Sequence, residues 1–150
     1  MRASDFVLAL LLAHGAGASA ACLAIAPSLA FGPYDGLSGA ATTTSANVVV
    51  TCNQTPAPVV TIAIGPSGVS GGFAPRRMGH IGSSDTLAYN LYTDAAATSI
   101  WGDGSGGTAT RSQRVQKNQP WAATIYGRIP AGQDVAAGSY SDVLTITVNF

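Results

Sequence analysis

The chain has 150 residues with seven basic and seven acidic side chains, so its formal net charge is zero and gives no electrostatic reason to bind nucleic acid or an anionic membrane. Glutamate is absent and lysine occurs once, whereas glycine, threonine, serine and valine are plentiful. Because residues that favour exposed helix faces are largely missing, the composition predicts an all-β protein.

The N-terminal segment 1–20 is typical of a secretory signal peptide. Arg2 precedes an apolar run at 6–13, and small residues follow up to Ala20. This run of eight residues is far shorter than the ~20 needed to span a bilayer, and no later segment is long enough. We therefore expect export, cleavage after Ala20 and a single domain at 21–150.

Cys22 and Cys52 both lie in the part of the chain that we expect to be exported. In an oxidising compartment, a disulfide is the default state of two such thiols. Closing a loop of about 30 residues would stabilise the fold by roughly 3 to 4 kcal/mol. Redox catalysis would need a closer Cys-x-x-Cys pair, and a metal site would need more ligands. We therefore predict a structural disulfide and no metal or other cofactor.

Beyond Cys22, short alternations of apolar and polar residues are separated by turn-rich stretches, at the spacing expected of a β-sandwich. The segments 65–85, 101–108 and 130–140 are rich in Gly, Pro, Ser and Asp and predict loops or turns. Between them we predict strands at 46–52, 58–65, 86–94, 119–129 and 140–150.

The predicted C-terminal strand has apolar residues at every second position, namely Leu144, Ile146, Val148 and Phe150. Such a pattern is typical of a half-buried strand, so we expect these four side chains to face the interior together. A hydrophobic strand with no successor must pair with an earlier segment, or its edge stays open to another chain.

A catalytic site is hard to assemble from these residues. His80 is the one histidine after residue 20, and its Gly- and Ser-rich surroundings favour a solvated loop residue. No G-x-S-x-G motif is present. Six aspartates remain, and each lies in or beside a turn, where this side chain commonly bonds backbone amides: Asp35, Asp85, Asp94, Asp103, Asp134 and Asp142. We predict no enzyme activity.

Two further motifs are better explained without a ligand. The sequence at 102–107 lacks the Gly-Lys-Ser/Thr ending of a phosphate loop and has too few carboxylates for calcium. Arg76 and Arg77 are expected to be a solvated pair in a loop.

Four segments taken in order, at 31–52, 71–78, 87–108 and 126–150, resemble the spore coat protein U domain, the fold unit of archaic chaperone-usher pilus subunits. The resemblance implies an incomplete immunoglobulin-like β-sandwich whose final strand is supplied by a partner. The implied partners are a periplasmic chaperone, an usher and a neighbouring pilus subunit that donates a strand. It also implies passage through the periplasm to the cell surface, with Leu144, Ile146, Val148 and Phe150 lining the acceptor groove.

The resemblance leaves the place in the fibre open. Pilus rod subunits that resemble this chain carry a donor segment before the first cysteine, whereas only Ala21 separates the expected cleavage site from Cys22. We therefore expect a subunit that accepts a strand and terminates the fibre, in adhesion and biofilm formation. The alternatives are a spore, cyst or matrix coat protein and a surface-binding tip module. In such a module Tyr34, Phe73 and Trp101 would contact a surface, although we favour a role for them in capping the core.

Overall fold

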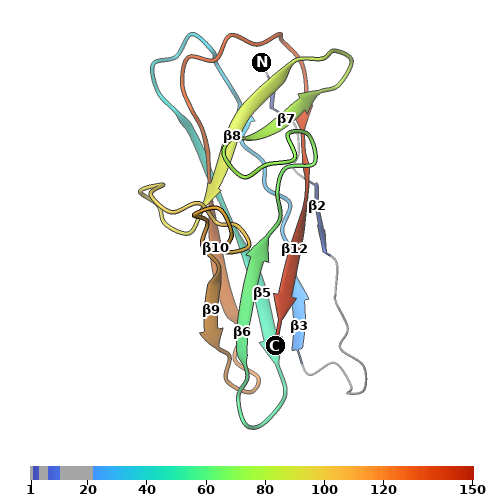
Figure 1. Ribbon diagram of the computed structural model, residues 1–150, viewed down its shortest axis with the longest axis vertical. Coiled ribbons are helices and arrows are strands. Elements are labelled where there is room, and N and C mark those ends of the chain that lie inside the picture. Colours follow the sequence, from blue (N-terminus) through green and yellow to red (C-terminus); the bar gives the residue numbers. More distant parts are fainter. Residues whose placement is uncertain (1, 4–6, 11–21) are drawn as a thin grey trace.

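The computed structural model describes residues 2–3, 7–10 and 22–150, which form twelve strands and no helix (Figure 1). Two sheets pack against each other, and β1 (Arg2–Ala3) and β4 (Gly32–Pro33) form a separate short pair. Within these ranges no helix has the length and apolar character needed to cross a membrane. The predicted all-β sandwich is therefore confirmed.

The larger sheet has six antiparallel strands in the order β11-β7-β8-β10-β5-β3. The central pair, β10 with β5, is the longest and runs in register from Trp121 opposite Val50 to Ile129 opposite Thr42. The strands are β3 (Cys22–Ile25), β5 (Thr42–Cys52), β7 (Arg76–His80), β8 (Thr86–Tyr92), β10 (Trp121–Ile129) and β11 (Tyr140–Ser141).

The smaller sheet has the order β2-β12-β6-β9. Its strands are antiparallel except for β2, which runs parallel to β12. The strands are β2 (Val7–Leu10), β6 (Val59–Ile64), β9 (Arg111–Arg114) and β12 (Val143–Asn149).

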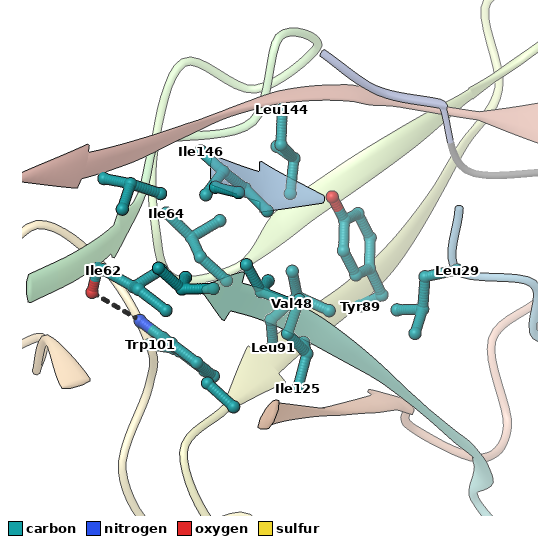
Figure 2. Packing of buried hydrophobic residues seen from close by; sticks show 14 of the residues in the cluster. Leu29, Val48, Ile62, Ile64, Tyr89, Leu91, Trp101, Ile125, Leu144 and Ile146 are labelled. Carbon is teal, nitrogen blue, oxygen red and sulfur yellow. Dashed lines mark hydrogen bonds between the residues drawn. The ribbon is translucent and has the colours of Figure 1, made fainter. Parts of the chain in front are cut away.

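The core lies between the two sheets and is built from the alternate residues of each strand. Ile62 and Ile64 of β6 face Val48 of β5 and Leu91 of β8 (Figure 2). Trp101 is fully buried at the edge of this cluster and donates its indole N–H to the Ile62 carbonyl at 3.0 Å. The apolar alternation seen in the sequence is thus the inner face of the sandwich.

The strands predicted at 46–52, 58–65, 86–94 and 119–129 correspond to β5, β6, β8 and β10, with β5 starting earlier, at Thr42. The predicted strand at 140–150 is two strands. It changes sheets at Asp142, so that β11 pairs with β7 in one sheet and β12 with β6 in the other.

Six strands were not expected from the sequence, namely β1, β2, β3, β4, β7 and β9. The 65–85 segment, predicted as loop, contains β7. Strand β9 has the sequence Arg-Ser-Gln-Arg and no apolar alternation, because it is an edge strand whose side chains face mostly outward. Strand β3 is a short strand at one edge of the larger sheet. It pairs with β5, and Cys22 lies opposite Cys52 in this pairing.

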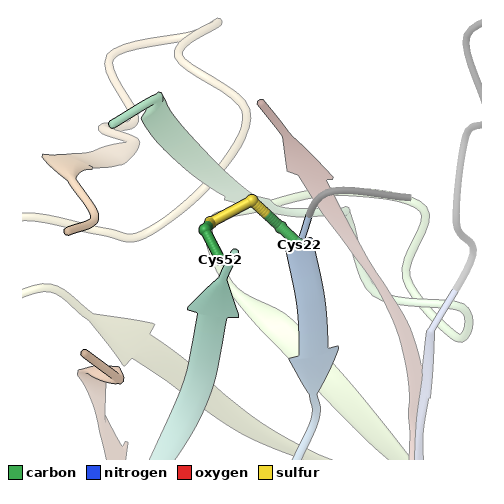
Figure 3. Close-up of a disulfide and its surroundings, with 2 residues drawn as sticks. All are labelled: Cys22 and Cys52. Carbon is green, nitrogen blue, oxygen red and sulfur yellow. A yellow bond between two sulfur atoms is a disulfide. The ribbon is translucent and has the colours of Figure 1, made fainter. Parts of the chain in front are cut away.

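The predicted disulfide between Cys22 and Cys52 is present, with an S–S distance of 2.04 Å. It joins the first residue of β3 to the last residue of β5 (Figure 3). Both cysteines are buried. The bond therefore fastens the short edge strand β3 to the longest strand of the sandwich.

We expect the double substitution Cys22→Ser and Cys52→Ser to lower the free energy of unfolding by about 3 to 4 kcal/mol, because the bond closes a sequence separation of 30 residues. Urea unfolding of this variant and the oxidised wild type would measure the difference. Reduced wild type should unfold like the variant. An unchanged unfolding midpoint after complete reduction would show that the bond does not stabilise the fold.

Candidate strand-acceptor site

Strand β12 pairs with a different strand on each of its edges. Its second half, Ile146 to Asn149, pairs antiparallel with β6, where Ile146 lies opposite Ile64. Its first half pairs parallel with β2, from Val143 opposite Val7 to Ile146 opposite Leu10. Without β2, the smaller sheet would end at β12.

The strand on this outer edge comes from a distant part of the sequence. Strand β2 is a Val-Leu-Ala-Leu segment inside the 1–20 range for which we predicted a signal peptide. Apart from β1 and β2, that range and the expected cleavage site lie outside the described residues, so the signal peptide stays a prediction. What the structure establishes is that the outer edge of β12 receives an apolar strand in parallel orientation.

The inner face of β12 is apolar and almost fully covered. Leu144, Ile146 and Val148 are at most 2% exposed, whereas Val143 on the opposite face is 54% exposed. Figure 2 shows Leu144 and Ile146 pointing toward the residues of the other sheet. Phe150 does not follow the expected pattern. It lies after the last strand residue and is 49% exposed, because the strand ends before the alternation can turn its ring inward.

Arg76 ties the two sheets together beside this site. It belongs to β7 of the larger sheet and is fully buried, and its guanidinium donates to the carbonyls of Gly65 at 2.9 Å and Trp101 at 2.8 Å, and to Asn90 Oδ1 at 2.8 Å. Gly65 in turn donates its backbone N–H to the Thr145 carbonyl of β12 at 2.8 Å. The arginine therefore fixes the end of β6 where β6 meets β12.

Burial lowers the pKa of Arg76 to about 10, so the guanidinium keeps its charge at neutral pH. A buried charge is tolerated when polar groups surround it, and here backbone carbonyls and an amide oxygen supply that environment. The expectation of a solvated Arg76–Arg77 pair is wrong for Arg76. Only Arg77 is partly exposed, and it donates to Thr86 Oγ1 at 3.1 Å.

Asp142 organises the point at which the chain changes sheets. Its carboxylate is buried and accepts the Tyr89 hydroxyl at 2.7 Å, the Gly68 N–H at 3.0 Å and the Val143 N–H at 2.9 Å. Burial, followed by the charge of Asp142, raises the pKa of Tyr89, so this hydroxyl stays protonated as a donor. Asp142 therefore fixes the first residue of β12 against the larger sheet.

The remaining candidate residues have structural surroundings. Tyr34 and Trp101 are core residues, at 1% and 0% exposure, so neither is available for contact with a surface. Phe73 is half-buried, with the Arg76 guanidinium 5.3 Å from its ring centroid. His80 is in strand β7, not in a loop, and its ring meets that of Tyr140 edge to face at 5.0 Å.

No group of three or more His, Cys, Asp or Glu side chains within the described ranges is placed to hold a metal ion. Sequence reasoning missed Arg76 although a signal was present. Arg76 and Met78 lie two positions apart in the sequence and are both buried, whereas Arg77 between them is partly exposed. Because Arg76 is charged, it was not recognised as a buried position of a strand.

We expect Arg76→Met to lower the free energy of unfolding by about 3 kcal/mol or more, because it leaves buried carbonyls without their donor. Arg77→Met is the matched control, since it removes the same charge from the neighbouring, partly exposed position. It should cost no more than about 1 kcal/mol. Urea unfolding of the two variants would measure this difference, and equal losses would remove the structural role assigned to Arg76.

The comparisons with known proteins agree with this architecture. The chain is similar to Protein U of Myxococcus xanthus, with 34% identity over 104 residues that cover 67% of this chain and 56% of that protein. The chain thus spans little more than half the length of this relative. The sequence also matches the family model of the Spore Coat Protein U domain over residues 8–147.

The fold is similar to a chain in the crystal structure of a chaperone–tip adhesion subunit pre-assembly complex from the archaic chaperone-usher Csu pili of Acinetobacter baumannii. The TM-score is 0.59 over 86% of this chain and 39% of the other. The sequence identity is 16%, so this likeness concerns the fold alone. The family match, which covers nearly the whole sequence, shows that the chain belongs to the spore coat protein U domain family.

Proposed function

We propose that the chain is an exported structural subunit of an archaic chaperone-usher pilus, without enzymatic activity, whose strand β12 accepts a strand from a partner. The observation that carries this proposal is the parallel pairing of β2 with the outer edge of β12. It means that the rest of the sandwich leaves this edge unpaired, and that an apolar strand fits there.

The physical argument rests on what the removal of β2 would expose. The backbone N–H and C=O groups along the outer edge of Val143 to Ile146 would lose their partners, and an unpaired edge is a template for another strand. Leu144 and Ile146 alternate on the core face beside this edge. Strand addition supplies both the missing hydrogen bonds and an apolar cover, which is the mode of recognition called β-augmentation.

The family and the fold support the partners that we propose. The structurally similar chain belongs to a complex of a chaperone with a tip adhesion subunit of a Csu pilus. By analogy, a periplasmic chaperone would occupy the β12 edge first, and an usher would exchange it for the donor strand of a neighbouring subunit. The subunit would then stand at the cell surface.

We further propose that the subunit terminates the fibre and serves adhesion and biofilm formation. The support is the expected cleavage after Ala20, which would leave only Ala21 before Cys22 and so no strand to donate to a neighbouring subunit. The second candidate is a coat or matrix protein that keeps the fold without polymerising. This candidate is favoured if β2 stays part of the mature chain, because a sheet that completes itself needs no second polypeptide.

We expect Val148→Asp and Ile146→Ala to abolish capture by the chaperone, because both side chains are buried on the core face of the strand that would accept the partner. Truncating a buried Ile to Ala costs about 2 to 5 kcal/mol, enough to unfold a marginal domain. Co-purification of chain 21–150 with its co-expressed chaperone would measure capture. Thr145→Ser and Thr147→Ser, which lie on the other face of β12, are the matched controls and should be captured normally.

The variants must first be shown to reach the periplasm in similar amounts. If Val148→Asp were recovered with the chaperone as well as the wild type, β12 would not line the acceptor site. If the wild-type chain 21–150 were folded and monomeric and bound no chaperone, the coat-protein alternative would replace the pilus proposal.

A further inference from the structure

A shallow cleft of about 480 Å³ lies on the outer face of the larger sheet. Its lining comes from β5, β8, β10 and the loop that follows β8, which projects on the side away from β2 and β12 in Figure 1. Tyr126 of β10 lies directly between Tyr92 of β8 and Ser45 of β5 in the strand register. One row across three strands therefore presents two aromatic rings and a hydroxyl at the cleft.

The tyrosines of this cleft differ from the others in the chain. Tyr34, Tyr89 and Tyr140 are buried, and each donates its hydroxyl to an oxygen of the protein between 2.7 and 3.0 Å away. Tyr92 and Tyr126 are half-exposed, and neither hydroxyl makes a hydrogen bond within the described part of the chain. A tyrosine whose ring is partly covered and whose hydroxyl is free is suited to contact a ligand.

Arg128 differs from the other arginines in the same way. Arg77, Arg111 and Arg114 each donate to a nearby oxygen, and Arg76 is the buried donor described above. Arg128 is exposed, has no such partner among the described residues, and lines the same cleft as the two tyrosines. The free arginine and the two free tyrosine hydroxyls of residues 22–150 thus converge on one place.

The loop on one side of the cleft is held in a fixed shape. Asp94 accepts the backbone N–H of Thr98 at 3.1 Å and of Ser99 at 2.9 Å, and these bonds lower the pKa of its carboxyl. Ala97, which lines the cleft, adopts the left-handed conformation with φ 56°, rare for a residue with a side chain. A wall that is ordered before binding reduces the entropy lost when a ligand binds.

We propose that this cleft binds an acidic saccharide, that is, a sugar chain with carboxylate groups. The guanidinium of Arg128 would pair with the carboxylate, because its fork of donors matches the two oxygens. The rings of Tyr92 and Tyr126 would lie against the apolar face of a sugar ring. The side chains of Thr43 and Ser45, both exposed at the cleft, and the tyrosine hydroxyls would bond the sugar hydroxyls. The volume suits a ligand of one to three sugar units.

This site is independent of strand acceptance, because it lies on the outer face of the other sheet. Isothermal titration calorimetry of the full chain would compare a mannuronic acid trisaccharide with the neutral maltotriose. We expect the acidic sugar to bind more tightly. Arg128→Gln should weaken it by about tenfold or more, since a hydrogen bond to a charged group is lost, and should leave maltotriose binding unchanged. Tyr126→Ala should weaken both sugars.

Lys117→Gln is the matched control, because it removes the same charge from another exposed position of the chain. It should bind the acidic trisaccharide like the wild type. Thermal unfolding would verify that each variant is folded, and Tyr126→Phe, which keeps the ring, serves if Tyr126→Ala is not. The proposal is overturned if neither sugar binds at millimolar concentration, or if Arg128→Gln and Lys117→Gln weaken the acidic sugar equally, which would indicate attraction by net charge alone.

Discussion

The backbone pairing of β12 is the constraint on which the rest of the structure depends. A strand inside a sheet needs a partner on both edges, and the sandwich formed by residues 22–150 supplies only β6. The outer edge is filled by β2, a strand far away in the sequence. Strand β2 runs parallel to β12, whereas the other pairs of that sheet are antiparallel. Because the core face of β12 is fully apolar, this edge demands a strand that brings both hydrogen bonds and cover.

Two buried polar residues position β12 for this role. Arg76 reaches from the larger sheet to the backbone carbonyl of Gly65, whose N–H bonds β12, and Asp142 secures the first amide of the strand. Neither residue forms a direct ion pair with the other in the described chain. Each is hydrogen-bonded by backbone groups and neutral side chains, so both buried groups are satisfied within the core and specify where the sheets meet. In a sandwich that lacks one strand, these hydrogen bonds hold the two sheets in a fixed relative position.

The sequence predicted those parts whose local pattern agrees with their environment. Strands β6, β8 and β10 alternate because one face of each is buried, and the disulfide followed from there being two cysteines. Strand β7 was missed because Arg76 is buried although it is charged. Strand β9 was missed because it has only polar residues and lies at the sheet edge. Inward burial of Phe150 was wrong, because strand length is set by pairing with β6 and not by alternation. The cleft at Tyr92, Tyr126 and Arg128 is lined by three strands, so it could be recognised only once the register between these strands was known.

Hydrogen–deuterium exchange along β12 would test the central claim most directly. The chain would be compared as residues 21–150 alone, as the full chain, and as residues 21–150 bound to the chaperone. The account predicts that the amides of 143–146 exchange rapidly in residues 21–150 alone and are protected in both other states, while β10 stays protected throughout. Equal protection of 143–146 in all three states would contradict it, because the edge would then need no added strand.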